Sequence, residues 1–99
     1  MDISKPSLQG FTVYSKSGCF NCVKVKNLLQ NTNFLFNVVN CDEYIIENKE
    51  YFLSFITEKI GHRYNIFPFV FYDYKFIGGF SETSEYVKKL LLSFEDNFW

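Results

Sequence analysis

VYSKSGCFNCVKVKNLL, residues Val13–Leu29, contains two of the three cysteines of the chain, three positions apart. The apolar run Gly10–Tyr14 predicts a buried strand, because β-branched and aromatic residues favour strands. Ser15-Lys16-Ser17-Gly18 breaks this run. From Cys22 to Gln30 apolar residues recur at helical spacing, which predicts a short amphipathic helix. The two cysteines therefore lie at a predicted strand-to-helix junction.

This junction favours redox chemistry at the cysteine pair. Unpaired backbone N–H groups and the positive end of the helix dipole lie at a helix start, where Cys19 is expected, and they stabilise a thiolate. The thiolate, and not the thiol, is the nucleophile, and Lys16 would add positive charge. Cys22, one turn further on, is expected to be more buried and able to attack a mixed disulfide at Cys19. The pair predicts thiol–disulfide exchange.

A structural zinc site is the weaker alternative for the same cysteines. Its remaining ligands would be Cys41 and His62, a lone cysteine and a lone histidine on different elements. Zinc sites usually take their ligands in two closely spaced pairs, which this spacing does not provide. We expect Cys41 to be a buried, inert thiol and His62 to be a polar loop residue.

The remainder of the chain predicts a mixed α/β domain. A strand over Phe34–Asn40 completes a βαβ unit, whose two strands should be parallel. A helix over Ile46–Ile60 follows, with Gly61 as its C-cap. Two short strands around Asp73-Tyr74 predict a hairpin with a loose turn, because tyrosine disfavours the left-handed conformation. Ser81 is the expected N-cap of a last helix, Glu82–Phe94. The expected apolar faces of these two helices are Tyr51, Phe52, Phe55, Ile56 and Ile60, and Tyr86, Val87, Leu90, Leu91 and Phe94.

Length and charge limit the function classes. The chain has 99 residues, 47% of them hydrophobic, which predicts one domain over 1–99 with a short leader over 1–9. Ten basic and eleven acidic residues give a net charge of −1 without a basic block, so nucleic-acid binding has little support. No secretory signal or membrane span is visible, and we expect a cytoplasmic protein, encoded by a cell or a virus.

Three blocks of this sequence together resemble the glutaredoxins, a branch of the thioredoxin-fold family. They are YSKSGCFNC at Tyr14–Cys22, IFPFVF at Ile66–Phe71 and KFIGGFSE at Lys75–Glu82, in the same order as in that family. The resemblance implies a four-stranded mixed sheet of order 2-1-3-4 flanked by helices. It also implies glutathione-dependent reduction of protein disulfides and of glutathione mixed disulfides.

The resemblance implies a role for individual residues. Cys19 would be the nucleophile and Cys22 the resolving thiol, while Lys16 would meet a glutathione carboxylate. Pro68 would be a cis-proline that presents the backbone of Phe67 to the ligand. The cysteinyl unit of glutathione would pair with that backbone like an added strand. The remaining residues of the expected glutathione site are Phe20, Gly79, Phe80, Ser81 and Glu82, of which the last two would hold the γ-glutamyl end.

Some positions differ from the family pattern. Phe20-Asn21 lies between the cysteines, where dithiol members carry Pro-Tyr, so the Cys19 pKa and the redox potential do not follow from the family. Phe67 is bulkier than the usual aliphatic residue, and Glu82 replaces the usual aspartate. Arg63 is the candidate second group for the glycyl carboxylate, although it falls about two positions early.

The family also offers an alternative function and the expected partners. Some members carry a [2Fe–2S] cluster between two subunits, through the nucleophilic cysteine and glutathione. The monothiol branch that specialises in this role ends its motif in serine, where this chain has Cys22, but the missing proline after Cys19 keeps the alternative open. Otherwise we expect a monomer without a metal, with glutathione as co-substrate and protein disulfides, such as that of ribonucleotide reductase, as substrates.

Overall fold

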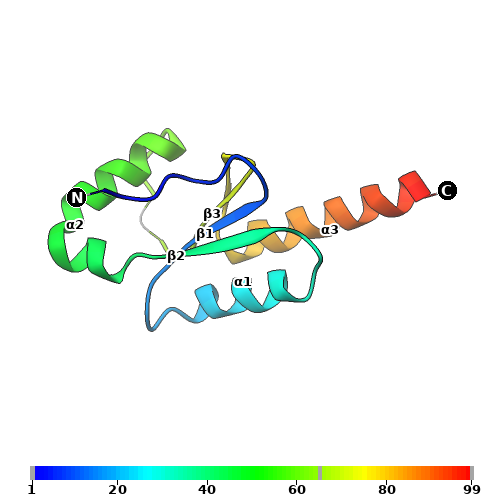
Figure 1. The fold of residues 1–99 in the computed structure, drawn as a ribbon, viewed down its shortest axis with the longest axis horizontal. Helices are drawn as coiled ribbons and strands as arrows, with labels where there is room; N and C mark the ends of the chain where they lie inside the picture. The colour runs from blue at the N-terminus through cyan, green and yellow to red at the C-terminus, as the bar shows by residue number, and fades with distance from the viewer. Residues whose placement is uncertain (1, 65, 99) are drawn as a thin grey trace.

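The computed structural model describes residues 2–64 and 66–98, which form a four-stranded sheet and three helices (Figure 1). Strand order is β2-β1-β3-β4. β1 pairs parallel with β2 and antiparallel with β3, and β3 pairs antiparallel with β4. The predicted α/β architecture and sheet order are confirmed. In chain order the elements are β1 Phe11–Ser15, α1 Phe20–Gln30, β2 Phe36–Asn40, α2 Asp42–Ile60, β3 Phe69–Tyr72, β4 Lys75–Gly78 and α3 Phe80–Phe98.

Helices cover both faces of the sheet, and β1 supplies side chains to each face in turn. Phe11 and Val13 pack with α1 and α3, in a cluster that also contains Val25, Leu29, Val70 and Val87. Tyr14 packs on the other face with α2, in a cluster that also contains Val39, Cys41, Phe52, Ile56, Phe69 and Phe71. Successive strand residues point to opposite faces, and all five residues of β1 are buried, as expected for a central strand between two layers of helices.

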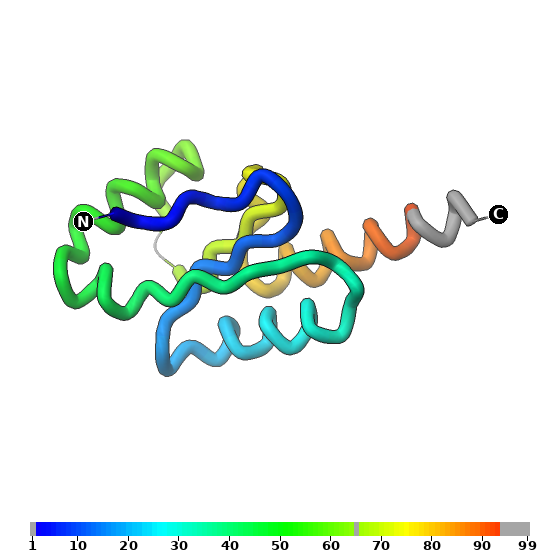
Figure 2. Tube along the Cα trace, viewed as in Figure 1, coloured from blue at the N-terminus to red at the C-terminus, as the bar shows by residue number. Residues whose placement is uncertain are grey.

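The segment before β1 packs on the domain. It runs past α2 and turns back into β1 (Figure 2). Pro6 is buried, and Ile3 packs against the cluster on the α2 face. The Tyr14 hydroxyl donates to the Ser4 carbonyl at 2.5 Å, and the Ser4 N–H donates to the Tyr44 hydroxyl at 3.3 Å. These contacts hold the described part of the leader against the α2 layer.

α2 begins earlier than predicted and is kinked. It starts at Asp42 instead of Ile46, and Asn48 has non-helical dihedrals, φ −159° and ψ 88°. The Asn48 side-chain oxygen accepts the Tyr51 N–H at 3.0 Å, so it caps the longer second part of the helix. Tyr51 is 51% exposed, and its predicted place on the apolar face is wrong. The buried stripe follows Phe52 and Ile56, four positions apart, and Tyr51 lies to one side of it.

The β3–β4 turn is tighter than predicted. Only Asp73 and Tyr74 connect the strands, both with positive φ, 49° and 74°. The Asp73 carboxylate accepts the Gly10 N–H at 2.7 Å, and the Lys59 ammonium donates to the Tyr74 hydroxyl at 3.1 Å. These contacts compensate for the unfavourable left-handed conformation of Tyr74.

The outer helices also differ in detail from the prediction. α1 begins at Phe20, two residues earlier than Cys22, and α3 begins at Phe80. Val87 is buried, but Leu91 is 46% exposed, so its predicted place in the core is wrong, and Phe94 lies outside the residues whose side chains are described. Gly61 has φ +93° and ends α2, as predicted. Within the part of the chain that the structure describes, no helix has the length and apolar character needed to cross a membrane.

Candidate active site

Cys19 and Cys22 form a disulfide at the start of α1. Cys19 is the N-cap residue, with extended dihedrals, and its sulfur accepts the Cys22 N–H at 3.1 Å. Cys19 is partly exposed, whereas Cys22 is buried. This N-cap position directs free backbone N–H groups toward the Cys19 sulfur, which favours its thiolate once the bond is reduced. Cys19 is therefore the accessible residue of the pair.

The loop before Cys19 is tied to the start of α2. Ser17 donates its N–H at 2.9 Å and its hydroxyl at 2.5 Å to the Asp42 carboxylate. These two hydrogen bonds, helped by the charge of Lys16, hold the pKa of Asp42 below its usual value. The adjoining Cys41 N–H donates to the Ser15 carbonyl at 2.8 Å. The Lys16–Gly18 loop is thus positioned from the β2–α2 junction.

Lys16 lies beside the predicted cis-proline segment. Its ammonium is 5.4 Å from the centre of the Phe67 ring, and the Phe67–Pro68 peptide bond is cis. The Phe67 ring stacks on Phe52 of α2, with centroids 5.9 Å apart and planes 3° apart, which accounts for an aromatic residue at this position. Lys16 and Phe67 line a recess of about 310 Å³ with Arg63, and its other lining residues are Ile45, Lys49, Glu50, Phe52 and Leu53. Its three cationic side chains could receive a carboxylate.

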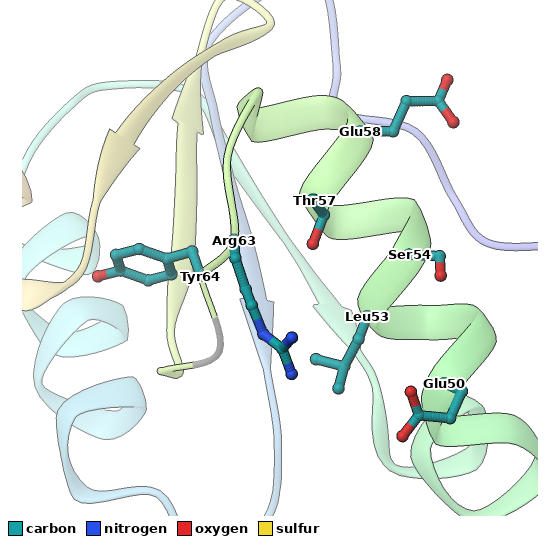
Figure 3. A pocket seen from close by; sticks show the side chains of 7 residues that line it. All are labelled: Glu50, Leu53, Ser54, Thr57, Glu58, Arg63 and Tyr64. Atoms are coloured by element: carbon teal, nitrogen blue, oxygen red, sulfur yellow. The ribbon is translucent and has the colours of Figure 1, made fainter.

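Arg63 also lines a neighbouring recess between α2 and the loop that follows it. Figure 3 shows the Arg63 side chain extending toward Leu53 and Glu50 of α2, whereas Tyr64 points away from α2. Arg63, Leu53 and Glu50 line both this recess and the recess beside Lys16. The loop is therefore able to present Arg63 toward Lys16 in spite of its early position in the sequence.

The Gly78-Gly79 pair and Glu82 form the start of α3. The Gly79 carbonyl accepts the Thr83 N–H at 3.0 Å, and the Gly79 N–H donates to the Glu82 carboxylate at 2.8 Å. Gly79 is thus the N-cap residue and Glu82 completes half of a capping box. The prediction that Ser81 is the cap is wrong, since Ser81 is an exposed residue inside the first turn. Its N–H is still one of the free donors of that turn.

Tyr64 joins this group and was not predicted from the sequence. A Cβ on Gly79 would lie 3.5 Å from the Tyr64 hydroxyl, 3.5 Å from Glu82 Oε1 and 3.7 Å from the Pro68 carbonyl. Burial, together with the Glu82 charge, raises the pKa of Tyr64, so its hydroxyl stays protonated and can donate. No sequence motif identifies this tyrosine, because its position beside Gly79 depends on the conformation of the loop.

Phe20 and Phe80 flank a shared lysine next to the disulfide. Lys24 Nζ lies 4.9 Å from the centre of the Phe20 ring and 5.0 Å from that of Phe80. Phe20 is 72% exposed and Phe80 is half-buried. Such cation–π contacts favour a fixed orientation of exposed rings. Lys24 therefore links the start of α1 to the start of α3.

Cys41 and His62 lie at the two ends of α2, whereas the disulfide lies at the start of α1. Cys41 is fully buried in the cluster on the α2 face, and burial raises its pKa to about 12. His62 is exposed in the loop after α2. Among the side chains that the structure describes, no three of His, Cys, Asp or Glu gather closely enough to hold a metal ion. The zinc alternative therefore lacks a ligand set in the described structure.

The comparisons agree with this geometry. The glutaredoxin family model matches residues 11–77. The crystal structure of glutaredoxin 1 from Francisella tularensis complexed with cacodylate is 26% identical, with a TM-score of 0.70, covering 82% of this chain and 94% of that chain. The holo form of glutaredoxin C1 from Populus tremula x tremuloides is 29% identical, with a TM-score of 0.65 and coverages of 80% and 68%. The buckwheat glutaredoxin–glutathione complex is 25% identical, with a TM-score of 0.64 and the same coverages, 80% and 68%. No curated protein sequence matches the chain.

Proposed function

Because the chain belongs to the glutaredoxin family, we propose that it is a glutathione-dependent thiol–disulfide oxidoreductase with Cys19 as nucleophile and Cys22 as resolving thiol. The observation that carries this assignment is the unequal exposure of two bonded cysteines at a helix start. Cys19 is the partly exposed N-cap residue, and Cys22 is buried one turn further on. Only the Cys19 sulfur is open to an incoming disulfide.

The exchange has two steps. The Cys19 thiolate attacks one sulfur of a substrate disulfide, a new S–S bond forms at Cys19, and the other substrate sulfur leaves as a thiolate. Either the Cys22 thiolate or a glutathione thiolate then attacks the mixed disulfide and releases the second substrate thiol. Two glutathione molecules return the Cys19–Cys22 disulfide to the dithiol and leave as glutathione disulfide. The N-cap backbone N–H groups and Lys16 stabilise the Cys19 thiolate in each cycle.

The glutathione molecule would lie across the groups around Cys19. Its glycyl carboxylate would meet Lys16 and Arg63, which line one recess. Its cysteinyl backbone would pair with Phe67 beside Pro68. Its γ-glutamyl carboxylate would accept N–H donors of the first turn of α3, near Ser81. Glu82 would receive the ammonium group.

Glu82 can serve both the helix and the ligand in this arrangement. One of its carboxylate oxygens already accepts the Gly79 N–H at 2.8 Å. The second oxygen is the one that we assign to the glutathione ammonium. The reducing compartment that supplies glutathione would be the cytoplasm.

Two cysteine variants test the assignment in a coupled glutathione and glutathione reductase assay. Cys19→Ser should lose reduction of every substrate, because no other described thiol is accessible. Cys22→Ser should keep deglutathionylation, which needs one thiol, and should lose the route through the intramolecular disulfide. Substantial turnover by Cys19→Ser would overturn the role of Cys19.

Cluster carriage remains a second candidate for the same cysteine. Both functions need Cys19 as a reduced thiolate, but the exchange route also uses Cys22 as a second thiol, and the two sulfurs are bonded in this structure. Exchange is therefore the function that the geometry favours. Anaerobic reconstitution with iron and sulfide, followed by visible absorption, separates the two: a coloured dimer would support the carrier, and a colourless monomer would exclude it.

A further inference from the structure

A separate recess lies at Cys19, and the proposed glutathione site does not use most of it. Ser17, Gly18, Phe20, Val23 and Lys26 line it beside Cys19, and Lys16 lies on its border with the glutathione side. Its volume is about 330 Å³. Phe20 and Val23 are 72% and 51% exposed, so the first turns of α1 present an apolar surface next to the reactive sulfur.

This surface carries positive charge. Lys26 lines the recess, and the Lys24 ammonium lies over the Phe20 ring at 4.9 Å. Residues 3–41, which include β1, the active-site loop, α1 and β2, contain four lysines and no aspartate or glutamate. The other parts of the chain hold six basic and all eleven acidic residues. Among the described side-chain hydrogen bonds, the carboxylate that contacts this loop is that of Asp42, which accepts two hydrogen bonds from Ser17.

We propose that this surface, defined as Phe20, Val23, Lys24 and Lys26 beside Cys19, docks protein substrates in which acidic residues flank the target cysteine. The inference rests on the proposed function and names its substrate class. Phe20 and Val23 contact the apolar atoms of the substrate segment, and the two lysines attract its carboxylates. Opposite charge around a reactive centre raises the rate of encounter and favours one orientation of approach.

The recess beside Lys16 and the recess at Cys19 together give a glutathionylated substrate a defined orientation. Glutathione lies on the Lys16, Phe67 and Glu82 side, and the protein segment lies on the Phe20 and Lys26 side. The Cys19 thiolate attacks the glutathione sulfur and forms an S–S bond to it, while the substrate cysteine leaves as a thiolate over α1. The substrate side chains next to that cysteine then lie close to Lys24 and Lys26.

Three glutathionylated peptides test the proposal on the intact protein. They are identical except that two Asp, two Asn or two Lys residues flank the single cysteine. We expect kcat/KM to be highest for the Asp peptide, lower for the Asn peptide and lowest for the Lys peptide. The ratio of kcat/KM between the Asp and Lys peptides should be on the order of tenfold at low salt. Above about 0.5 M salt the ratio should approach one, because the Debye length falls to a few ångströms.

A double substitution tests which lysines carry the preference. Lys24→Gln with Lys26→Gln should bring the Asp-to-Lys ratio close to one at low salt. The matched control, Lys75→Gln with Lys88→Gln, changes the net charge equally at exposed positions on β4 and α3 and should keep the ratio. A ratio that survives in the Lys24 and Lys26 variant would overturn the assignment of this surface.

The outcomes for the wild-type protein separate the two proposals. Equal turnover of all three peptides would refute the docking preference and leave the reductase activity standing. Failure to reduce the peptides and also the small, uncharged 2-hydroxyethyl disulfide would overturn the proposed function, and the docking inference with it.

Discussion

Alanine substitutions at the adjacent Gly78 and Gly79 should have different principal effects. Gly78→Ala should mainly lower stability, and Gly79→Ala should mainly weaken ligand binding. In Gly78→Ala the new Cβ would lie 2.7 Å from Cβ and Cγ of Glu82 and 2.8 Å from its Oε1. Carbon atoms pack at about 3.5–4.0 Å, so Glu82 has to move. Gly78 also has φ +139°, which an L-residue rarely adopts.

The magnitude follows from these two costs. The backbone conformation costs about 1–3 kcal/mol for a residue with a Cβ. Displacing Glu82 breaks its hydrogen bond to the Gly79 N–H, a capping contact that contributes about 1 kcal/mol. We therefore expect Gly78→Ala to lower the free energy of unfolding by about 2–4 kcal/mol. For a domain of this size each kcal/mol lowers Tm by about 4–8 °C.

Gly79→Ala should be tolerated by the fold and harmful to glutathione binding. Its Cβ would lie no closer than 3.5 Å to any neighbour among the described residues, which is ordinary contact. Loss of glycine at the N-cap costs at most about 1 kcal/mol. The added methyl group would occupy the space among Tyr64, Glu82 and the Pro68 carbonyl, where we place glutathione. The KM for glutathione should rise on the order of tenfold, which corresponds to about 1.4 kcal/mol of binding energy.

Thermal unfolding of the reduced proteins by circular dichroism, with glutathione kinetics on the same samples, measures both effects. The fall in Tm should be at least about twice as large for Gly78→Ala as for Gly79→Ala. Equal Tm values for the two variants would refute the steric argument at Glu82. An unchanged KM in Gly79→Ala would refute the location of the ligand.

Three further predictions concern single side chains. The pKa of Asp42 is lowered in the folded protein. Its contribution to stability is therefore present above the pKa of the unfolded chain and is lost as pH falls through the lower folded-state pKa. The difference in Tm between wild type and Asp42→Asn should shrink between pH 6 and pH 3, and a constant difference would contradict this. The buried Thr83 hydroxyl has no hydrogen-bond partner among the described residues. Thr83→Val should therefore keep the free energy of unfolding or raise it by up to about 1 kcal/mol, as measured by urea titration. A clear loss of stability would reveal a partner. Burial raises the pKa of Cys41 to about 12. In the folded, reduced protein at pH 8, Cys41 should therefore resist iodoacetamide while Cys19 is alkylated, which mass spectrometry would show. Labelling of both cysteines at similar rates would contradict the burial of Cys41.

Local patterns were sufficient to predict the elements that carry the cysteines. The apolar run before Ser15 and the helical spacing after Cys22 predicted β1 and α1, and the following apolar run predicted a parallel β2. The structure confirms all three, with α1 extended to Phe20 because Cys19 is the cap. Helix boundaries were less predictable, since Asn48 interrupts α2 through a side-chain hydrogen bond that no periodic pattern contains.

Interactions between segments distant in sequence could not be read from periodicity. Tyrosine disfavours a left-handed turn, yet Tyr74 adopts one while its hydroxyl accepts a hydrogen bond from Lys59 on α2. Ser81 looked like a cap, but Glu82 and Gly79 perform that role through a contact inside the first turn of α3.

The sequence by itself determined the order of strands and helices, the redox pair at a helix start, and the family. These properties depend on residue type and spacing within short windows, where local conformational preferences and amphipathic burial act. Only the tertiary structure decided that Tyr64 reaches Gly79, that Arg63 shares a recess with Lys16, and that Lys24 lies between Phe20 and Phe80. Each of these contacts joins different elements, and its geometry exists only after the sheet has brought their ends together.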